Sequence, residues 1–273
     1  MRIALLQMTS GTDPQANART IADAIAAAAE GGAQILFTPE MSGLLDRDRG
    51  RAASRIVSEE EDVVLAAARS ATAAADITVA LGSLAIASDG GWANRSFLIG
   101  PGGEITARYD KIHMFDVSLA NGESWRESAA YTAGRDVVTA QTPLGTLGLA
   151  ICYDVRFPAL FEELGRARCD AIAVPAAFTV PTGKAHWHLM LRARAVEASA
   201  FVIAAAQVGE HEDGRRTYGH SLVVDPWGEV LLDMGGDKAG LAFCELDLDR
   251  IDEVRRQLPS LANRREVPKS ARP

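Results

Sequence analysis

The sequence predicts an α/β protein in which two mixed sheets face each other and helices pack outside them. In the first third of the chain, short apolar runs of strand length alternate with amphipathic helices, which is typical of βαβ units. Further along, strand pairs recur around glycine-containing turns, which is typical of antiparallel hairpins. Parallel units and hairpins in one chain indicate mixed sheets.

The N-terminal part follows the order strand, helix, strand, helix, strand. The segment "NARTIADAIAAAAEGG" carries apolar residues at helical spacing and ends in two glycines, which favour helix termination. The expected strands are 2–8, 33–40 and 77–86, and the expected helices are 17–32 and 60–75.

Three hairpins are expected after residue 90. They are "RSFLIGPGGEITARYDKIHM", turning at 101–103, "VVTAQTPLGTLGLAICYD", turning at Gly145, and "HSLVVDPWGEVLLDM", turning at 226–228. Helices at about 158–167 and 185–199, and the strands "AIAVPAAF" and "AFVIAAAQV", lie between them.

The chain reads as one domain over residues 1–258, followed by a polar, basic tail over 259–273. Its 273 residues, 48% of them hydrophobic, are enough for one large core, and no linker or repeat marks a boundary. The net charge of −8 argues against a nucleic acid partner, which requires a basic face.

Membrane insertion and disulfide bonding are not expected. No run approaches the roughly 18 apolar residues of a membrane span, and "MRIALLQMTSGTDP" is too weakly apolar for a signal peptide. Cys152, Cys169 and Cys244 are odd in number and widely spaced, unlike a disulfide framework or a zinc site. We therefore expect a cytoplasmic protein with reduced thiols.

Three expected strands end in a reactive group. "ILFTPE" ends in Glu40, "ITARYDK" in Lys111 and "LGLAIC" in Cys152. Singly, Glu40 and Lys111 are typical of exposed turns, and Cys152 suits core packing as well as reactivity. Because ligands of layered α/β proteins bind beyond the carboxyl ends of strands, the three together indicate an active site.

These three groups are sufficient for nucleophilic catalysis without a histidine. A thiol with a pKa near about 8.5 needs a base or a cation beside it. A carboxylate such as Glu40, in a partly apolar pocket, is expected to have its pKa raised toward about 7 and to accept the thiol proton. Lys111 and the backbone N–H of Tyr153 could hold the oxyanion of a tetrahedral intermediate.

Four segments of the chain resemble the nitrilase superfamily of carbon–nitrogen hydrolases. "FTPE", "YDKIHMFD" and "LAICYDVRFP" look like its three signature segments, and "RESAAYTAG" matches the segment of a fourth acid, at Glu127. The resemblance runs from residue 3 to residue 259. "AAFTVPTGKAHWHLMLRARAVE" and "YGHSLVVDPWGEVL" are most similar to the amidase branch that contains omega-amidase and deaminated-glutathione amidase.

The resemblance implies a four-layer αββα sandwich with no cofactor and no metal. It implies hydrolysis of a small-molecule amide through a thioester, with release of ammonia. Glu40 would be the base, Lys111 the oxyanion stabiliser, Cys152 the nucleophile and Glu127 a residue that orients the others. At the rim the chain departs from the family pattern, with Ala133, Ala159, Lys184 and His188 at positions where the family usually has other residues.

The expected substrate is a small terminal amide that also carries a carboxylate. Deaminated-glutathione-type compounds come first and omega-amides second, with N-carbamoyl amino acids as a further alternative. Arg156, four residues beyond Cys152, could grip the carboxylate with its planar fork, or could form a salt bridge with Asp154. In the family-like arrangement Tyr153, Phe178 and Thr182 would line the same pocket.

Other interpretations remain open. His113, beside Lys111, could make the protein a Cys–His hydrolase. The chain could also be an inactive family member that acts as a scaffold. His186 and His188 point apart if they lie on a helix, which argues against their forming a metal-binding pair. "MGGDKAG" (234–240) reads as a hairpin loop.

We also expect a homodimer. The helix beginning "RFPALFEELGRARCD" has an apolar stripe at Phe157, Leu160, Phe161 and Leu164. Such a stripe can pack within its own chain or against a second copy. The 259–273 tail is expected to lie along a neighbour or a surface.

Overall fold

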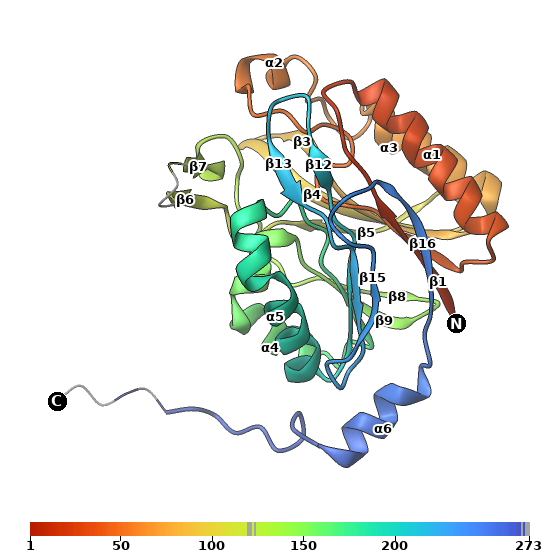
Figure 1. Cartoon of the computed structure of the whole chain (residues 1–273), viewed down its shortest axis with the longest axis vertical. Helices are drawn as coiled ribbons and strands as arrows, with labels where there is room; N and C mark the ends of the chain where they lie inside the picture. The colour runs from red at the N-terminus through yellow and green to blue at the C-terminus, as the bar shows by residue number, and fades with distance from the viewer. Residues whose placement is uncertain (119–121, 123, 269, 271–273) are drawn as a thin grey trace.

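The computed structural model describes residues 1–118, 122, 124–268 and 270. It contains two six-stranded sheets packed face to face, with helices on both outer sides (Figure 1). The predicted four-layer αββα sandwich is confirmed. Residues 269 and 271–273 of the expected tail lie outside the described part of the chain.

The first sheet has the strand order β16-β1-β2-β3-β4-β5. Strands β1, β2 and β3 are parallel, and β4, β5 and β16 are added by antiparallel pairing. Helices α1 (Pro14–Glu30) and α3 (Val63–Ala75) cover its outer face. The strands are β1 (Arg2–Gln7), β2 (Ile35–Phe37), β3 (Thr78–Ser88), β4 (Gly91–Ile99), β5 (Ile105–Asp110) and β16 (Gly240–Glu245).

The second sheet has the order β15-β14-β11-β10-β9-β8. Strands β9, β10 and β11 are parallel, and the predicted hairpins β8–β9 and β14–β15 form its two edges. Helices α4 (Pro158–Arg166) and α5 (Val180–Ala198) cover its outer face. The strands are β8 (Thr139–Thr142), β9 (Gly145–Leu149), β10 (Ala171–Ala173), β11 (Phe201–Ala204), β14 (Leu222–Val224) and β15 (Val230–Asp233).

Alternation along the strands produces the two cores. In β1, Ile3 and Leu5 face the second sheet, whereas Ala4 and Leu6 face α1 and α3. Ile3 and Leu5 belong to one apolar cluster with residues of the facing sheet, such as Leu147 of β9. The sheets are therefore held together by a continuous buried interface.

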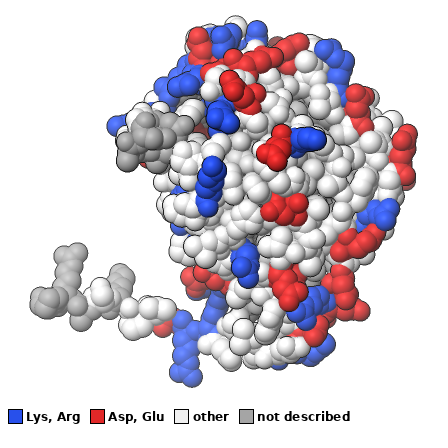
Figure 2. All heavy atoms as spheres, viewed as in Figure 1, with Lys and Arg blue, Asp and Glu red and all other residues white. Residues whose placement is uncertain are grey.

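Short elements complete the chain. They are α2 (Arg49–Ala53), β6 (Asp116–Ser118), β7 (Ser124–Arg126), the 3₁₀ turns η1 (Glu127–Ala129) and η2 (Cys152–Arg156), β12 (Val208–Glu210), β13 (Arg216–Tyr218) and α6 (Asp249–Gln257). No helix among the described residues is both long enough and apolar enough to span a membrane. On the face shown in Figure 2, acidic and basic side chains are interspersed.

Two segments differ from expectation. Residues 234–240 do not close a hairpin, because β15 belongs to the second sheet and β16 pairs with β1 of the first. The apolar stripe of α4 is turned inward: Leu160, Phe161 and Leu164 are at most 4% exposed. Within the tail, Arg264 donates to the carbonyl of Glu162 at 2.7 Å, so this part lies along α4 of its own chain.

Candidate active site

The carboxyl ends of three strands bring Glu40, Lys111 and Cys152 to one cavity. Strands β2 and β5 run in the same direction in the first sheet, so Glu40 and Lys111 emerge at the same edge. Cys152 follows β9 of the facing sheet. All three side chains are buried, with residue exposures of 4%, 2% and 7% respectively.

Glu40 is fixed by the close approach of its segment to β3. A Cβ at Gly82 would lie 2.0 Å from the carbonyl oxygen of Thr38, so only glycine allows this contact. The Thr38 hydroxyl accepts the N–H of Gly82 at 2.9 Å. On the other side, the Gln207 amide donates to the Glu40 carbonyl at 3.0 Å. The backbone that carries Glu40 is therefore held on both sides.

Lys111 lies between two carboxylates. Its Nζ is 2.9 Å from Oε1 of Glu40 and 2.9 Å from Oε2 of Glu127. The N–H of Phe115 donates to Oε2 of Glu127 at 2.6 Å, which fixes that carboxylate. A buried ammonium needs such partners because an unpaired buried charge is costly.

Asn94 is a site residue that sequence reasoning missed. From β4, its Nδ2 donates to Glu40 at 3.0 Å and to Glu127 at 3.1 Å. It is fully buried, and its Oδ1 has no hydrogen-bond partner among the described residues. Its place in β4, beside the apolar Ala93 and shortly before the apolar run from Phe97 to Ile99, was the available signal, since buried amides need partners.

Cys152 stands on a strained turn. Its φ is 48°, in the left-handed region that non-glycine residues rarely adopt. Its N–H donates to the carbonyl of Pro175 at 2.9 Å. The next N–H, that of Tyr153, belongs to the first turn of η2, where a helix leaves its N–H groups without intrahelical acceptors.

The charges favour a neutral thiol beside an ionised carboxylate. Burial favours the neutral acid of Glu40, but the Lys111 ammonium and hydrogen bonds from Lys111, Cys152 and Asn94 hold the pKa of this carboxyl below its ordinary value. The expectation of a pKa raised toward 7 was therefore wrong, because it omitted the adjacent cation. Burial and the negative charge of Glu40 raise the pKa of the Cys152 thiol well above its ordinary value, although Lys111 opposes this.

Lys111 remains charged. Burial lowers the pKa of its ammonium, but Glu127 and Glu40 outweigh this and raise that pKa well above its ordinary value. The site thus holds a fixed positive charge, an ionised carboxylate that can accept a proton, and a thiol that can donate one. This combination can activate a sulfur nucleophile and stabilise an oxyanion.

Asp154 fixes the turn that carries Cys152. The carboxylate is fully buried and accepts from Tyr109 Oη at 2.7 Å and from the N–H of Ile151 at 2.9 Å. Nδ1 of His113 lies 2.7 Å from it. His113 is therefore engaged by Asp154 and is not among the residues that line the cavity, which weakens the Cys–His interpretation.

The cavity has a volume of about 150 Å³. Met41, Leu44, Leu45 and Trp92 line one part of its wall, and Phe115, Trp125, Tyr153 and Phe178 line another. Of the predicted substrate-binding residues, Tyr153, Phe178 and Thr182 line the cavity, whereas Arg156 does not. The Arg156 guanidinium lies 5.3 Å from the ring centroid of Phe178 and 3.3 Å from Nδ1 of His186.

The cavity wall is rich in arginine, which sequence reasoning also missed. Two guanidinium groups approach Trp125, that of Arg215 at 4.4 Å from the ring centroid and that of Arg47 at 5.6 Å. Asp213 lies 3.5 Å from the Arg215 guanidinium, and it accepts the backbone N–H of Arg47. Nε of Arg215 is buried without a hydrogen-bond partner among the described residues. Lining arginines are Arg47, Arg49, Arg126 and Arg215.

The αββα sandwich, with a cavity of this kind where its two sheets meet, defines the class of protein: an enzyme of the nitrilase superfamily. A family model for carbon–nitrogen hydrolases matches residues 2–256. The chain belongs to the carbon–nitrogen hydrolase family.

Several relatives with similar sequences are named deaminated glutathione amidase. A deaminated glutathione amidase of Synechocystis sp. is 40% identical over 268 residues, covering 96% of this chain and 97% of that protein. The deaminated glutathione amidase of Yersinia enterocolitica is 36% identical over 269 residues, covering 97% of this chain and 93% of that protein. The deaminated glutathione amidase of Bos taurus is 36% identical over 277 residues, covering 96% of this chain and 81% of that protein.

Solved structures of the family share the fold. The NitFhit protein of C. elegans aligns with a TM-score of 0.88 and 34% identity over 97% of this chain, which spans 65% of the NitFhit chain. A glutamate-to-glutamine mutant of the amidase from Nesterenkonia sp. aligns with a TM-score of 0.79 and 29% identity, covering 95% of this chain and 98% of that one. In that mutant, acrylamide has added to the active-site cysteine.

Proposed function

We propose that this protein hydrolyses an amide bond of a small carboxylate-bearing molecule through a thioester on Cys152. The observation that carries the proposal is the contact of Lys111 with Glu40 in the cavity that also contains Cys152. A nucleophile, a proton acceptor and an oxyanion partner lie together there, and a metal ion is not required for any step.

In the acylation half, the Cys152 sulfur attacks the amide carbonyl carbon while its proton passes to Glu40. The raised pKa of the thiol and the lowered pKa of Glu40 mean that the thiol is neutral at rest and that proton transfer accompanies attack. Lys111 and the Tyr153 N–H hold the oxyanion. The C–N bond then breaks, and the leaving nitrogen takes the proton from Glu40 and departs as ammonia, or as an amine where the substrate amide is of the peptide type.

In the deacylation half, Glu40 acts a second time. A water molecule takes the place of ammonia, gives a proton to Glu40 and attacks the thioester carbon. The C–S bond breaks, the sulfur regains its proton from Glu40, and the carboxylic acid leaves. Glu127 supports both steps as a positioning residue, since its carboxylate contacts the same Lys111 ammonium as Glu40 does.

The arginine-rich wall supports a substrate with a carboxylate. Asp213 lies 3.5 Å from the Arg215 guanidinium but accepts only the backbone N–H of Arg47. An incoming carboxylate could therefore pair with these guanidinium groups. Burial lowers the pKa of the Arg215 guanidinium, and a bound anion would offset that cost. We therefore transfer the carboxylate-gripping role first considered for Arg156 to Arg215, with Tyr153, Phe178 and Thr182 as neighbouring wall residues.

The named relatives support deaminated glutathione as the first substrate to test, because it combines an amide with carboxylates. Short omega-amides come second. The decisive experiment measures the carboxylic acid and the amine released from deaminated glutathione, whose amides are of the peptide type, and the ammonia released from omega-amides, N-carbamoyl amino acids and nitriles. The Cys152→Ala variant is the blank. We expect hydrolysis of a carboxylate-bearing amide that is absent in the blank. Alkylation of Cys152 without hydrolysis of any compound would instead indicate an inactive scaffold protein.

We further propose a homodimer that works in the cytoplasm. Since the α4 stripe is buried within the chain, the available apolar face lies on α5, at Leu189 and Val196, and on the adjoining β14–β15 hairpin at Trp227. These side chains are 68%, 42% and 45% exposed. Light scattering at micromolar concentration tests the dimer, and Leu189→Glu should dissociate it.

The three free cysteines support a reducing compartment, which cell fractionation tests.

A further inference from the structure

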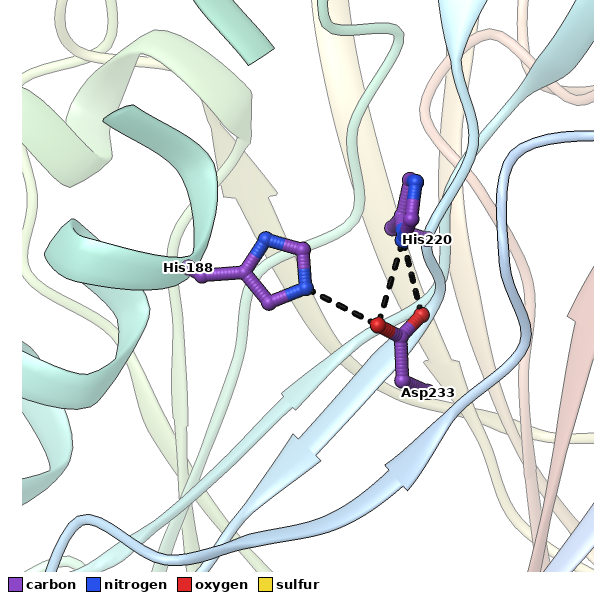
Figure 3. Close-up of side chains that lie close together, drawn as sticks. All are labelled: His188, His220 and Asp233. Carbon is purple, nitrogen blue, oxygen red and sulfur yellow. Dashed lines mark hydrogen bonds and ion pairs between the residues drawn. The ribbon is translucent and has the colours of Figure 1, made fainter. Parts of the chain in front are cut away.

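A second cluster of reactive side chains lies outside the catalytic cavity. Figure 3 shows His188 of α5 pointing toward His220 and Asp233, which flank the β14–β15 hairpin. None of the three lines the cavity that contains Cys152. His220 precedes β14 by two residues and Asp233 ends β15, so the backbone pairing of Leu222 with Asp233 brings these two together.

The three side chains converge closely. Nε2 of His188 lies 2.9 Å from Oδ2 of Asp233, and Nδ1 of His220 lies 2.9 Å from Oδ1 of the same carboxylate. One candidate ligand atom from each residue lies within 4.8 Å of the others. Their side chains are 36%, 24% and 33% exposed in the order His188, His220, Asp233, so an ion from solvent can reach them.

The surrounding backbone holds the cluster in place. His220 adopts a left-handed φ of 54°, and its N–H donates to the carbonyl of Gly235 at 2.8 Å. The Gly235 N–H in turn donates to Oδ1 of Asp233 at 2.9 Å. The indole of Trp187 donates to the carbonyl of His220 at 2.8 Å, which links the residue before His188 to the hairpin.

We propose that His188, His220 and Asp233 bind a single transition-metal ion, with Zn²⁺ as the best match. Two imidazole nitrogens and one carboxylate oxygen are ligands that suit Zn²⁺ better than Ca²⁺ or Mg²⁺. With three protein ligands, a water molecule would complete a tetrahedron. The single carboxylate supplies negative charge. The nearest lysine and arginine along α5 are Lys184 and Arg192, each four residues from His188; Lys184 is exposed, and Arg192 donates to the carbonyl of Gly228 at 2.7 Å.

Only a small rearrangement is needed. Tetrahedral Zn²⁺ with bonds of about 2.0–2.1 Å separates its ligand atoms by about 3.3 Å. The histidine-to-carboxylate distances would lengthen by a few tenths of an ångström, and the two rings would move together. Each imidazole would carry its proton on the ring nitrogen facing away from the metal. The ion would tie α5, whose first turn reaches the cavity at Thr182, to the second sheet.

The test uses the full chain after EDTA treatment, with Cys152→Ala in every arm so that the catalytic thiol cannot bind metal. Zn²⁺ is titrated by calorimetry, and Co²⁺ by its visible absorption. We expect one ion per chain and a Co²⁺ spectrum of nitrogen and oxygen ligands without thiolate charge-transfer bands. Zn²⁺ at about one hundred times its Kd should raise the Tm by about 5 °C.

The comparison of variants decides the assignment. His188→Gln keeps a good helix former on α5, and Asp233→Asn keeps the shape of the carboxylate; each should weaken binding at least about 100-fold. His186→Ala, two residues from His188 on another side of the helix, should bind as tightly as the parent. Equal binding by His188→Gln, or the absence of stoichiometric binding by the parent, would overturn the proposal. Melting without metal checks that each variant is folded.

Discussion

Cys152 and Cys169 are two buried thiols at opposite ends of neighbouring parallel strands. Cys152 lies beyond the carboxyl end of β9, and Cys169 lies just before the amino end of β10. Burial raises the pKa of both, to about 12 for Cys169, where Asp170 adds to the effect. A shifted pKa therefore does not distinguish a nucleophile from a packed thiol.

The surroundings do distinguish the two thiols. Cys152 is next to a carboxylate, an ammonium and a cavity, whereas Cys169 packs at Gly148 and Leu164 and its carbonyl is bound by Arg255. The carboxyl ends of the strands carry the proposed chemistry, and the amino ends carry packing and an ion pair. Matched variants at the two ends test this difference.

The largest expected difference is between Cys152→Ala and Cys169→Ala. The first should lower kcat by at least about 10⁴-fold, because no other group can form the thioester. The second should leave kcat unchanged and cost about 1 kcal/mol of unfolding free energy through a small cavity. Ammonia release and denaturant unfolding measure both, and a large loss of kcat in Cys169→Ala would remove the distinction.

Glu40→Gln should lower kcat by about 10²–10⁴-fold, the usual contribution of a general base. The matched change, Asp170→Asn at the other end, removes a carboxylate that accepts the Thr146 N–H at 2.9 Å, and should affect stability alone. Mass spectrometry should find no thioester in Glu40→Gln after brief mixing with substrate. Rapid thioester formation in that variant would show that another group accepts the thiol proton.

Lys111→Met should lower kcat by about 10²–10³-fold, as for the loss of one oxyanion donor. It also leaves Glu40 and Glu127 without their shared cation, so the pKa of the Glu40 carboxyl should rise. Arg255→Met, which removes the cation beside Cys169, should instead lower the Tm while kcat stays the same. Near-normal kcat in Lys111→Met would contradict the oxyanion role.

Arg215→Leu should raise KM about 10-fold to 100-fold for the carboxylate-bearing amide, with little change for a neutral amide of equal length. Arg156→Leu provides the comparison, since Arg156 does not line the cavity and should change KM much less. A larger rise in KM for Arg156→Leu than for Arg215→Leu would show that Arg156 binds the substrate carboxylate. Steady-state kinetics with both substrates decides between them.

The smallest expected effect is that of pH. The pKa of Glu40 is below the ordinary value of about 4.3, and that of Cys152 is above the ordinary value of about 8.5. Glu40 is therefore ionised and the thiol protonated across the intervening range, so kcat/KM should be nearly flat from about pH 5 to 8 and should fall only on further acidification. A bell with a limb near pH 6.5 would point to a histidine.

The strand ends made the main site groups predictable from sequence. Glu40, Lys111 and Cys152 each follow an apolar run, and such runs end at one edge of a layered sheet. The prediction that Arg156 binds substrate relied on its nearness to Cys152 in the sequence. A 3₁₀ turn has three residues per turn, so the side chain of Arg156 is rotated by a third of a turn from that of Cys152. Arg156 contacts His186 on α5 instead.

Contacts between distant segments could not be predicted. Asn94 reaches Glu127 across 33 positions of the chain, and His188 reaches Asp233 across 45. The His186–His188 pair was correctly placed on a helix, yet the cluster that forms uses only His188. The pKa of Glu40 was misjudged for the same reason, since its sign depends on Lys111, which lies 71 positions away.

The division of the site between two sheets has a consequence for protein synthesis. A nascent chain that has completed the first five strands holds Glu40 and Lys111 but has not yet made Cys152. The first sheet also lacks its edge strand until β16 pairs with β1, and the Met1 ammonium donates to the carbonyl of Leu246 only then. The three site groups can therefore meet only after the second sheet has docked on the first. A chain stalled before residue 152 would hold the acid and the ammonium without the nucleophile.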